Sequence, residues 1–407
     1  MTTRKTLTLA CSLGLATLAA PTMAETTFKY GGFIKFDAIF SQYSDQARAG
    51  NVGDDFLVPS TIAVGDGSAE GDRVFDSNAK FSRLNFTTLT DTDAGKVKSF
   101  IEMDFNGGND ERLTNQASNG LRHAMFSLTK EDGSSILTGQ TWSTFFNTGA
   151  LPEAVDFVGP TSGSIFIRQP QVRYTMPVAG GKVMIAAENP SVGFYDAGAA
   201  NVIAVANGNS AEAQDAADSV VNDNNVDNST LPDLIARFDS KLAGLNYSAA
   251  IMLRQIGYNH SGFDESENGF ALTFSGKYAL SNGDDIKFML SNGNLGRYIA
   301  LNAYRDGAIQ ADGSIELTTV TGGFVAYKHK WSEKLRSTAM YAFSEADNDE
   351  NTVSDVTKSI NNINVNLMYS PAKKITFGAE YQMAERETES GANGDLSRIQ
   401  FTSKWAF

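Results

Sequence analysis

The most regular feature of this chain is a series of stretches in which apolar and polar side chains alternate. In FKYGGFIKFDAIF (28–40), aromatic and aliphatic residues share one parity and charged residues lie on the other. The alternation recurs in GKVKSFIEMDF (95–105), LNYSAAIMLRQ (245–255) and NINVNLMY (362–369). A period of two is typical of a β-strand with one apolar and one polar face.

This pattern predicts about sixteen strands along the whole chain. Their expected centres are residues 35, 84, 101, 125, 139, 171, 186, 236, 250, 274, 288, 323, 339, 364, 379 and 402. The connections alternate in length. The short ones contain turn-forming residues and are 90–95, 130–135, 177–181, 240–244, 281–284, 330–333 and 370–373. The long ones include 44–78, 107–120, 143–164, 191–231 and 346–358.

The alternation of short and long connections indicates an all-β fold, an up-and-down antiparallel barrel that crosses a membrane. A soluble sandwich has no reason to keep every second connection short. An outer-membrane barrel has tight turns at its periplasmic rim and long loops outside. Hydrocarbon offers backbone N–H and C=O groups no partner, so a sheet can span it only when the sheet is closed.

The last residues, SRIQFTSKWAF, fit the strand that closes such a barrel. Ile399, Phe401, Trp405 and Phe407 fall on one parity. Aromatic side chains are favoured at the membrane boundary. We therefore expect Trp405 and Phe407 to mark barrel closure, and residues 25–407 to form one transmembrane domain.

The first 24 residues have the pattern of a secretory signal peptide that is removed. Arg4 and Lys5 precede an apolar run from Leu7 to Ala20, and small residues surround a cleavage site after Ala24. The apolar run is shorter than the roughly 18 residues that a membrane anchor needs. The only cysteine lies inside this segment, so the mature chain has no thiol. A lipoprotein is the less favoured alternative, because only about four apolar residues precede that cysteine.

The mature chain is strongly acidic, yet its strands are predicted to carry positive charge inward. Removal of residues 1–24 leaves 31 basic and 47 acidic residues, a net charge of −16 in place of −14. This balance argues against nucleic acid as a partner. Lys and Arg on a lipid-facing position cost about 2–4 kcal/mol at mid-depth, so strand charges should face the lumen.

Parity assigns fourteen basic and six acidic residues to that inner face. The basic set is Lys29, Lys35, Arg83, Lys96, Lys98, Arg237, Arg254, Lys277, Lys287, Lys328, Lys330, Arg336, Arg398 and Lys404. The acidic set is Asp37, Glu102, Asp104, Glu188, Asp239 and Glu380. A positive, low-dielectric channel concentrates anions. The alternative is that many of these residues lie at the rims, pair with carboxylates and do not affect flux.

The segment 143–164 differs from the other long connections because it is rich in aromatic and apolar residues. Such a loop would be costly above the membrane. About sixteen strands leave a water-filled channel, so a loop that folds inward would narrow it. The expected constriction residues are Phe145, Phe146, Pro152, Glu153 and Asp156. The alternative is burial of this loop at a subunit interface.

The run from Leu121 to Met176 resembles the DcaP-like outer-membrane porins. The similarity is strong in GQTWSTF, ALPE and IRQPQVRYT, and looser in Gly31–Ala38, FLVPS (56–60) and AKFSRLNF around Arg83. The resemblance implies a sixteen-stranded trimeric channel for dicarboxylic acids and other small anions. It also implies a basic pore near the constriction, formed by Arg83, Arg122, Arg168 and Arg173 with Gln140 and Trp142 close by. Parity adds Lys35 and Arg254 to this pore-lining set.

The chain departs from the family pattern in two respects. Some members carry a periplasmic coiled coil before the barrel, whereas this mature chain begins almost at its first strand. Lys80 stands where an arginine is expected, which removes a bidentate fork from that position. Arg168 and Arg173 have opposite parity, and Pro170 between them could mark a bulge that resets it.

The sequence offers little for catalysis. His123, His260 and His329 belong to no GxSxG, HExxH or paired-carboxylate arrangement, so an enzyme is not expected. The acidic loop 264–267 could bind a divalent cation, but a solvated loop is the better interpretation. No cofactor or metal site is predicted.

The expected function is passive diffusion of small anions through an outer-membrane porin of a Gram-negative bacterium. The alternative is a non-transporting adhesin or surface scaffold that works through its long loops and has a blocked lumen. A plugged siderophore-type transporter needs about 22 strands, more than this chain supplies. The expected partners are small anionic solutes, outer-membrane lipid and lipopolysaccharide, barrel-assembly machinery bound to the C-terminal strand, and two further copies in a homotrimer.

Overall fold

The structure, a computed structural model, describes residues 25–45, 52–65, 70–110, 114–197, 229–260, 263–352 and 356–407. The predicted signal peptide lies outside these ranges and stays a prediction. No helix within them is long and apolar enough to cross a membrane.

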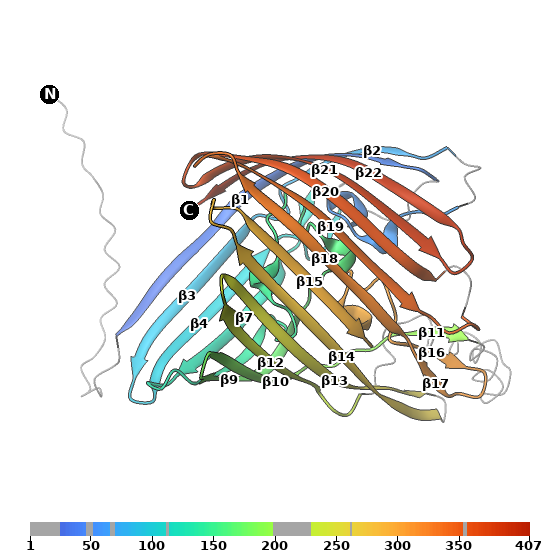
Figure 1. Cartoon of the computed structure of the whole chain (residues 1–407), viewed down its shortest axis with the longest axis horizontal. Helices are drawn as coiled ribbons and strands as arrows, with labels where there is room; N and C mark the ends of the chain where they lie inside the picture. Colours follow the sequence, from blue (N-terminus) through green and yellow to red (C-terminus); the bar gives the residue numbers. More distant parts are fainter. Residues whose placement is uncertain are drawn as a thin grey trace.

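The chain forms one closed antiparallel barrel (Figure 1). Its strands are β1 (Thr26–Tyr43), β2 (Arg73–Asn78), β3 (Arg83–Thr92), β4 (Gly95–Asp104), β7 (Gly120–Thr129), β8 (Ser135–Trp142), β9 (Arg168–Val178), β10 (Gly181–Glu188), β12 (Asp233–Leu242), β13 (Leu245–His260), β14 (Phe263–Ala279), β15 (Asp285–Gly293), β18 (Thr319–Lys330), β19 (Leu335–Asp347), β20 (Thr357–Ala372), β21 (Ile375–Thr388) and β22 (Asn393–Ala406). β2 and β3 both pair with β1 and share one position in the barrel, which therefore has sixteen.

The predicted strands are confirmed. Each of the sixteen expected centres falls within one barrel strand, and the predicted short connections join neighbouring strands. The predicted loop 44–78 is wrong at its end, because Arg73–Asn78 pairs with β1 as β2.

The last strand closes the barrel on the first. β22 pairs with β1 from Phe33 opposite Ala406 to Tyr43 opposite Leu396, and the backbone N–H of Phe407 donates to the Gly32 carbonyl at 3.1 Å. Gly32 has a φ of +152°, and a Cβ there would lie 2.1 Å from the Arg83 carbonyl oxygen. Only glycine therefore fits where β1, β3 and the C-terminus meet.

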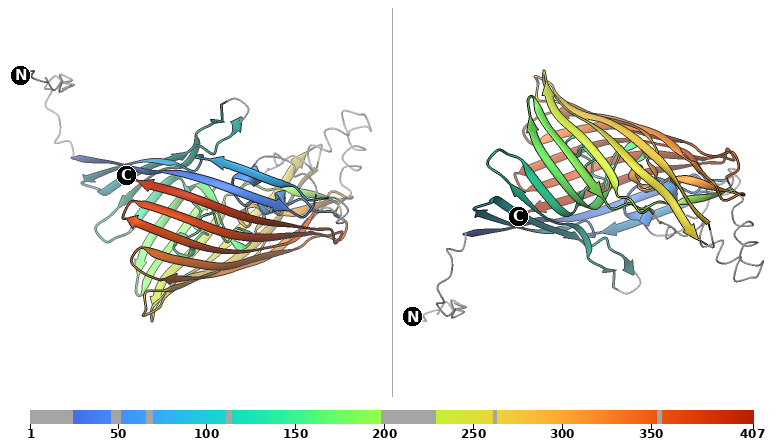
Figure 2. Two further views of the ribbon diagram at one scale, coloured as in Figure 1. Left: turned by 90° about the horizontal axis from the view of Figure 1, so that it is seen from above. Right: turned by 90° about the horizontal axis from the view of Figure 1, so that it is seen from below.

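Short elements occupy the connections (Figure 2). They are α1 (Val52–Asp55), η1 (Pro59–Thr61), β5 (Asn109–Asp110), β6 (Gln116–Ala117), η2 (Thr148–Ala150), η3 (Thr161–Gly163), β11 (Phe194–Ala197), η4 (Gly296–Tyr298), β16 (Gly307–Gln310) and β17 (Ile315–Leu317). β5 and β6 form a hairpin that projects from the barrel, and β11, β16 and β17 form a separate small sheet.

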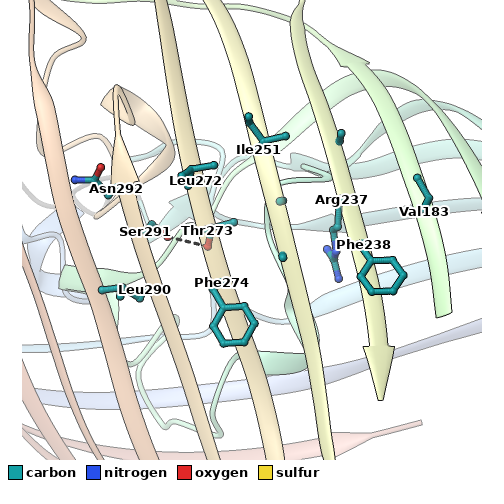
Figure 3. Close-up of a pocket in the computed structure, with 13 residues that line it drawn as sticks. Val183, Arg237, Phe238, Ile251, Leu272, Thr273, Phe274, Leu290, Ser291 and Asn292 are labelled. Carbon is teal, nitrogen blue, oxygen red and sulfur yellow. Dashed lines mark hydrogen bonds between the residues drawn. The ribbon is translucent and has the colours of Figure 1, made fainter. Parts of the chain in front are cut away.

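The two faces of the wall differ as the alternation predicts. On β13, Ile251 is 41% exposed, whereas the next residue, Met252, is fully buried. Phe274 on β14 is exposed, and the hydrogen bond from Ser291 to Thr273 (2.8 Å) lies on the other side of the wall (Figure 3). The apolar parity therefore faces outward, toward lipid. Side chains of β10 to β15 form a shallow apolar groove of about 610 Å³ on this outer wall.

The buried core of the molecule lies inside the barrel, where loops pack on the inner wall. Three segments fold inward: the first loop (residues 52–65), the constriction loop (143–164) and the first part, residues 294–304, of the β15–β18 loop (294–318). The constriction loop and the β15–β18 loop share a core with the inner-wall residues Ala186, Ile235, Met252, Met289, Val320, Phe324 and Ala342. The first loop packs with Tyr43, Ala384 and Leu396. The lumen is therefore less uniformly polar than parity alone predicts, because part of its wall is apolar and covered.

Candidate pore constriction

The constriction loop is attached to the inner wall along its whole length. The Glu380 carboxylate accepts hydrogen bonds from the backbone N–H groups of Val155 (3.0 Å) and Asp156 (3.1 Å). The amides of Asn364 and Asn366 donate to the same carboxylate, each at 2.9 Å. Asn residues on one parity of β20 thus provide a polar inner stripe that orients Glu380 toward the loop. The predicted inward folding of this loop is confirmed.

Basic side chains of other strands anchor further parts of the constriction loop. The side chain of Lys287 donates to the Leu151 carbonyl at 2.6 Å, and that of Arg237 donates to the Phe146 carbonyl at 2.8 Å. Arg336 grips the Glu153 carboxylate with two nitrogens, at 2.5 and 2.7 Å. Parity predicted that these three residues face the lumen. In the structure, several of their hydrogen-bond donors are used by the constriction loop.

The predicted constriction residues divide into packing and polar groups. Phe145 and Phe146 are buried in the core inside the barrel, and Pro152 lies beside the Leu151 and Glu153 anchor points. Asp156 is buried, and its carboxylate accepts hydrogen bonds from three backbone N–H groups, those of Leu57 (3.0 Å), Val158 (3.0 Å) and Gly159 (3.1 Å). It therefore stabilises the fold of the constriction loop and joins it to the first loop.

An open cavity of about 400 Å³ remains between the constriction loop and the wall formed by β4, β7, β8 and β9. Arg122 and Arg168 line it together with Gln140, Asp104 and aromatic residues of the loops. The bulge in β7 opposite Glu102 and Met103 places Arg122 toward this space.

A third guanidinium group, that of Arg83, lies beside these two arginines, because Arg83 and Arg122 share the carboxylate of Glu102. Arg122 binds Glu102 at 2.9 Å and Asp104 at 2.5 Å, and Arg83 lies 3.7 Å from Glu102. The Phe157 ring of the constriction loop lies 5.4 Å from the guanidinium carbon of Arg122 and 5.9 Å from that of Arg83. Within the described residues, Arg83 Nε, Arg122 Nη2 and Arg168 Nη1 are buried nitrogens without a hydrogen-bond partner. Buried donors without a partner are costly, and here they belong to three guanidinium groups that face only two carboxylates, Glu102 and Asp104.

Gln140 and Trp142 lie beside this cluster. The Gln140 side-chain amide donates to the Leu121 carbonyl at 3.1 Å, across the β7 bulge. The Arg168 guanidinium carbon lies 5.2 Å from the Trp142 ring, a cation–π contact. Trp142 in turn packs edge-on against Phe166.

The two arginines of β9 occupy different positions. Arg173 has the inward parity of the buried Gln171, between the exposed Val172 and Tyr174. Arg168 has the other parity but is the first residue of the strand, where the chain leaves the constriction loop and the side chain lines the cavity. Pro170 marks no bulge between β8 and β9, because their register runs without interruption.

Two other predicted pore residues are enclosed by partners. Arg254 is almost fully buried, binds Asp306 and lies 3.3 Å from Asp233, so it attaches the β15–β18 loop to the wall. This placement differs from the expected contact with solutes, because the loop that covers Arg254 could not be identified from parity. Lys35 is partly exposed and pairs with Asp37 at 2.5 Å.

Ion pairs reduce the positive excess that parity predicts. Among the residues that the structure describes, ion pairs hold eight of the fourteen inward basic residues: Lys35, Arg83, Arg237, Arg254, Lys277, Lys328, Lys330 and Arg336. Most of the partners are strand carboxylates, such as Asp233 and Asp285. Two partners, Glu153 and Asp306, come from loops, and sequence position alone does not show that these loops fold inward. Lys80, at the position where an arginine was expected, is also paired, with Asp55 at 2.7 Å.

Two of the histidines are hydrogen-bonded to residues of the barrel. His123 is buried and shares a hydrogen bond of 2.9 Å with Thr141. His329 lies 2.9 Å from Asp284 at a turn of the rim. Hydrogen bonds from the Tyr327 hydroxyl, the Lys330 backbone and His329 hold the pKa of Asp284 well below its usual range.

This architecture, a sixteen-stranded barrel narrowed by an inward loop, defines the class: the fold is that of outer-membrane channels. The structure matches the outer membrane channel DcaP of Acinetobacter baumannii with a TM-score of 0.72 and 22% identity, over 97% of this chain and 100% of that chain. The sequence profile of the DcaP outer membrane protein family matches residues 5–208 and 209–407, so the chain belongs to this family. The resemblance in the sequence and the predicted location, the outer membrane of a Gram-negative bacterium, are thereby confirmed.

More distant structures share the fold. An anion-selective porin from Comamonas acidovorans matches with a TM-score of 0.55 and 10% identity, over 94% of this chain and 100% of that chain. The trimer form of OmpT, an outer membrane protein of Vibrio cholerae, matches with a TM-score of 0.51 and 11% identity, over 94% of this chain and 99% of that chain. A search of curated protein sequences finds no match to this chain.

Proposed function

We propose that this protein is a passive outer-membrane porin that prefers small anions, dicarboxylates among them. The observation that carries the proposal is a cluster of three arginines in which Arg122 and Arg168 line the cavity and Arg83 lies 3.7 Å from Glu102, the residue that also pairs with Arg122. Arginine forks bind carboxylates in a bidentate manner, and the local pair of carboxylates, Glu102 and Asp104, leaves one positive charge in excess.

The proposed solute path passes Arg83, Arg122 and Arg168 at the constriction and continues past Arg173 on the inner wall. Partial pairing suits a channel better than a receptor, because conduction needs sites weak enough for the solute to leave. Lys35, Gln140 and Trp142 belong to the proposed lining as neighbours of this path. We propose no catalytic role for the chain.

The assembly proposed for the mature chain is a homotrimer in outer-membrane lipid and lipopolysaccharide. The trimer form of the Vibrio cholerae neighbour supports it. Cleavage of residues 1–24 would precede insertion. The assembly machinery would engage β22, where Trp405 and the following C-terminal residue, Phe407, lie at the closing seam.

Uptake into proteoliposomes tests this function. Succinate and acetate should enter faster than glucose, and glucose faster than putrescine, because the excess charge at the constriction attracts anions and repels cations. Equal rates for succinate and putrescine would contradict the proposal, as would uptake no faster than in empty liposomes.

A non-transporting scaffold remains the competing function, and one observation favours it. Three loops pack inside the barrel and bury a large part of its inner wall. This hypothesis predicts no uptake of any of the four solutes, a result that the same experiment would detect.

A further inference from the structure

The β15–β18 loop contains an unusual backbone segment beside the cavity. Ala300, Leu301 and Asn302 follow one another with φ values of 52°, 56° and 64°. L-residues disfavour this left-handed region, and three in succession occur only where the surroundings enforce them. The loop was not singled out in the sequence.

The surroundings that hold this segment belong to the end of the constriction loop. Ile299 forms an isolated β-bridge with Ile165. The backbone N–H of Phe166 donates to the Tyr298 carbonyl at 3.1 Å, and that of Ala300 donates to the Ser164 carbonyl at 3.1 Å. The two loops are thus joined by backbone hydrogen bonds.

A second contact fixes the loop to the wall. The Tyr298 side chain is fully buried, and its hydroxyl donates to Asp233 on β12 at 2.7 Å. Arg254, which binds Asp306, lies 5.2 Å from the Tyr298 ring. The turn at 300–302 therefore cannot move away from the constriction loop without breaking buried polar contacts.

The held turn presents one side chain to the open space. Ile299 and Ala300 are fully buried, whereas Leu301 is partly exposed and lines the 400 Å³ cavity. Phe56 of the first loop and Phe157 and Phe166 at the constriction loop line the same cavity, together with Arg122 and Arg168. Apolar side chains from three separate loops thus line the same cavity as the two arginines.

We propose that Leu301 is a specificity-determining residue that sets the upper size of the anions passing the arginine cluster. This inference rests on the proposed function, since it takes the cavity to be part of the solute path. In this proposal the arginines select solutes by charge, and Leu301 limits their size. A neutral, rigidly held side chain can narrow a passage without changing its ion preference.

Four variants separate size from charge. Leu301→Ala shortens the side chain. Leu301→Gly removes it and also accepts the left-handed backbone, so it serves if the alanine variant does not fold. Leu301→Trp enlarges the side chain. Leu290→Ala, on the exposed outer face of β15, is the matched control.

Single-channel conductance with graded polyethylene glycols measures the effective radius of each variant. Leu301→Ala and Leu301→Gly should raise conductance by about 1.5-fold and admit larger polymers, and Leu301→Trp should lower both, since flux depends on pore radius. Leu290→Ala should match the unmodified protein, and the zero-current potential in a salt gradient should be the same in all.

The outcomes distinguish this inference from the proposed function. Anion-preferring channels whose conductance and polymer cut-off are unchanged in all three Leu301 variants would overturn the role of Leu301 and leave the porin intact. An unmodified protein without channels would overturn both. A change in zero-current potential without a change in polymer cut-off would also contradict a size filter.

Discussion

Arg168 and Arg173 lie on the same strand, β9, but at different places along the proposed solute path. Arg168 lines the cavity beside Trp142, whereas Arg173 lies on the inner wall six residues from the turn at 179–180. Replacement of either by alanine removes a positive charge from the proposed path. Each variant should shift the zero-current potential toward cation permeability, with the larger shift for Arg168→Ala.

Lys330→Ala is the control for this comparison. It removes the same charge from a partly exposed rim position that is paired with Glu333. Its zero-current potential should change least, because exposed charges are screened over about 10 Å at 0.1 M salt. Unchanged potentials for both arginine variants would dismiss their role in selectivity.

Glu380 should determine how firmly the constriction loop is held. Its carboxylate accepts four hydrogen bonds, two from the loop backbone and two from asparagines. Glu380→Ala leaves these donors without their acceptor, and each unsatisfied buried donor costs about 1–3 kcal/mol. Single-channel recordings should show larger current fluctuations, and the thermal unfolding temperature should fall.

Glu385→Ala provides the comparison on the same strand, since Glu385 is hydrogen-bonded to Asn361 at an exposed position. It should leave both readings unchanged. A quiet, unaltered conductance in Glu380→Ala would show that the other anchors of the loop suffice without this carboxylate.

At the scale of the element, strands were predictable from the sequence and inward loops only in part. Period-two alternation is a local signal, and the need to close the sheet in lipid determines how the strands connect. The constriction loop was identified by its aromatic residues and prolines. The β15–β18 loop was missed because Tyr298 and Tyr304 are buried by partners distant in sequence, Asp233 and Ser344.

The contrast between local patterns and long-range contacts also explains why several charged residues predicted to line the pore are paired in the structure. Parity places Arg254 and Arg336 on the inner face, but the carboxylates that pair with them, Asp306 and Glu153, come from loops. Long-range pairing leaves no local pattern. The sequence could therefore predict which way a side chain points but not whether it remains open to solutes.

The junction of β1, β3 and the C-terminus, where the barrel closes, should tolerate no side chain at Gly32. Gly32→Ala would bring a methyl group against the Arg83 carbonyl and the Phe407 ring. Overpacking of this kind costs about 1–3 kcal/mol, so the folded barrel should convert to the unfolded form at lower temperature on a semi-native gel.

Gly31→Ala is the neighbouring control, because the nearest atom to its new methyl group is a side-chain oxygen of Asn85 at 3.1 Å that can move. It should unfold close to the temperature of the unmodified protein. Equal unfolding temperatures for the two variants would contradict the tight fit of β1, β3 and the C-terminus.

At the scale of the whole molecule, the acidic composition and the basic constriction are compatible because they occupy different places. Besides the six acidic residues predicted on the inner parity, Asp233 and Asp285 lie on the inner wall and pair with basic residues, and most of the remaining carboxylates belong to loops and turns. Charges outside the barrel are screened by salt, whereas those at a narrow, low-dielectric passage act on each solute. The net charge of the chain therefore does not decide which ions it prefers.

The zero-current potential of the purified protein in a planar bilayer, with unequal KCl on the two sides, tests this account most directly. The account predicts channels through which chloride permeates more readily than potassium, with a preference that grows as the salt is lowered from about 1 M to 0.1 M, because the screening length increases from about 3 to 10 Å. A preference for potassium at low salt, or the absence of channels, would contradict it.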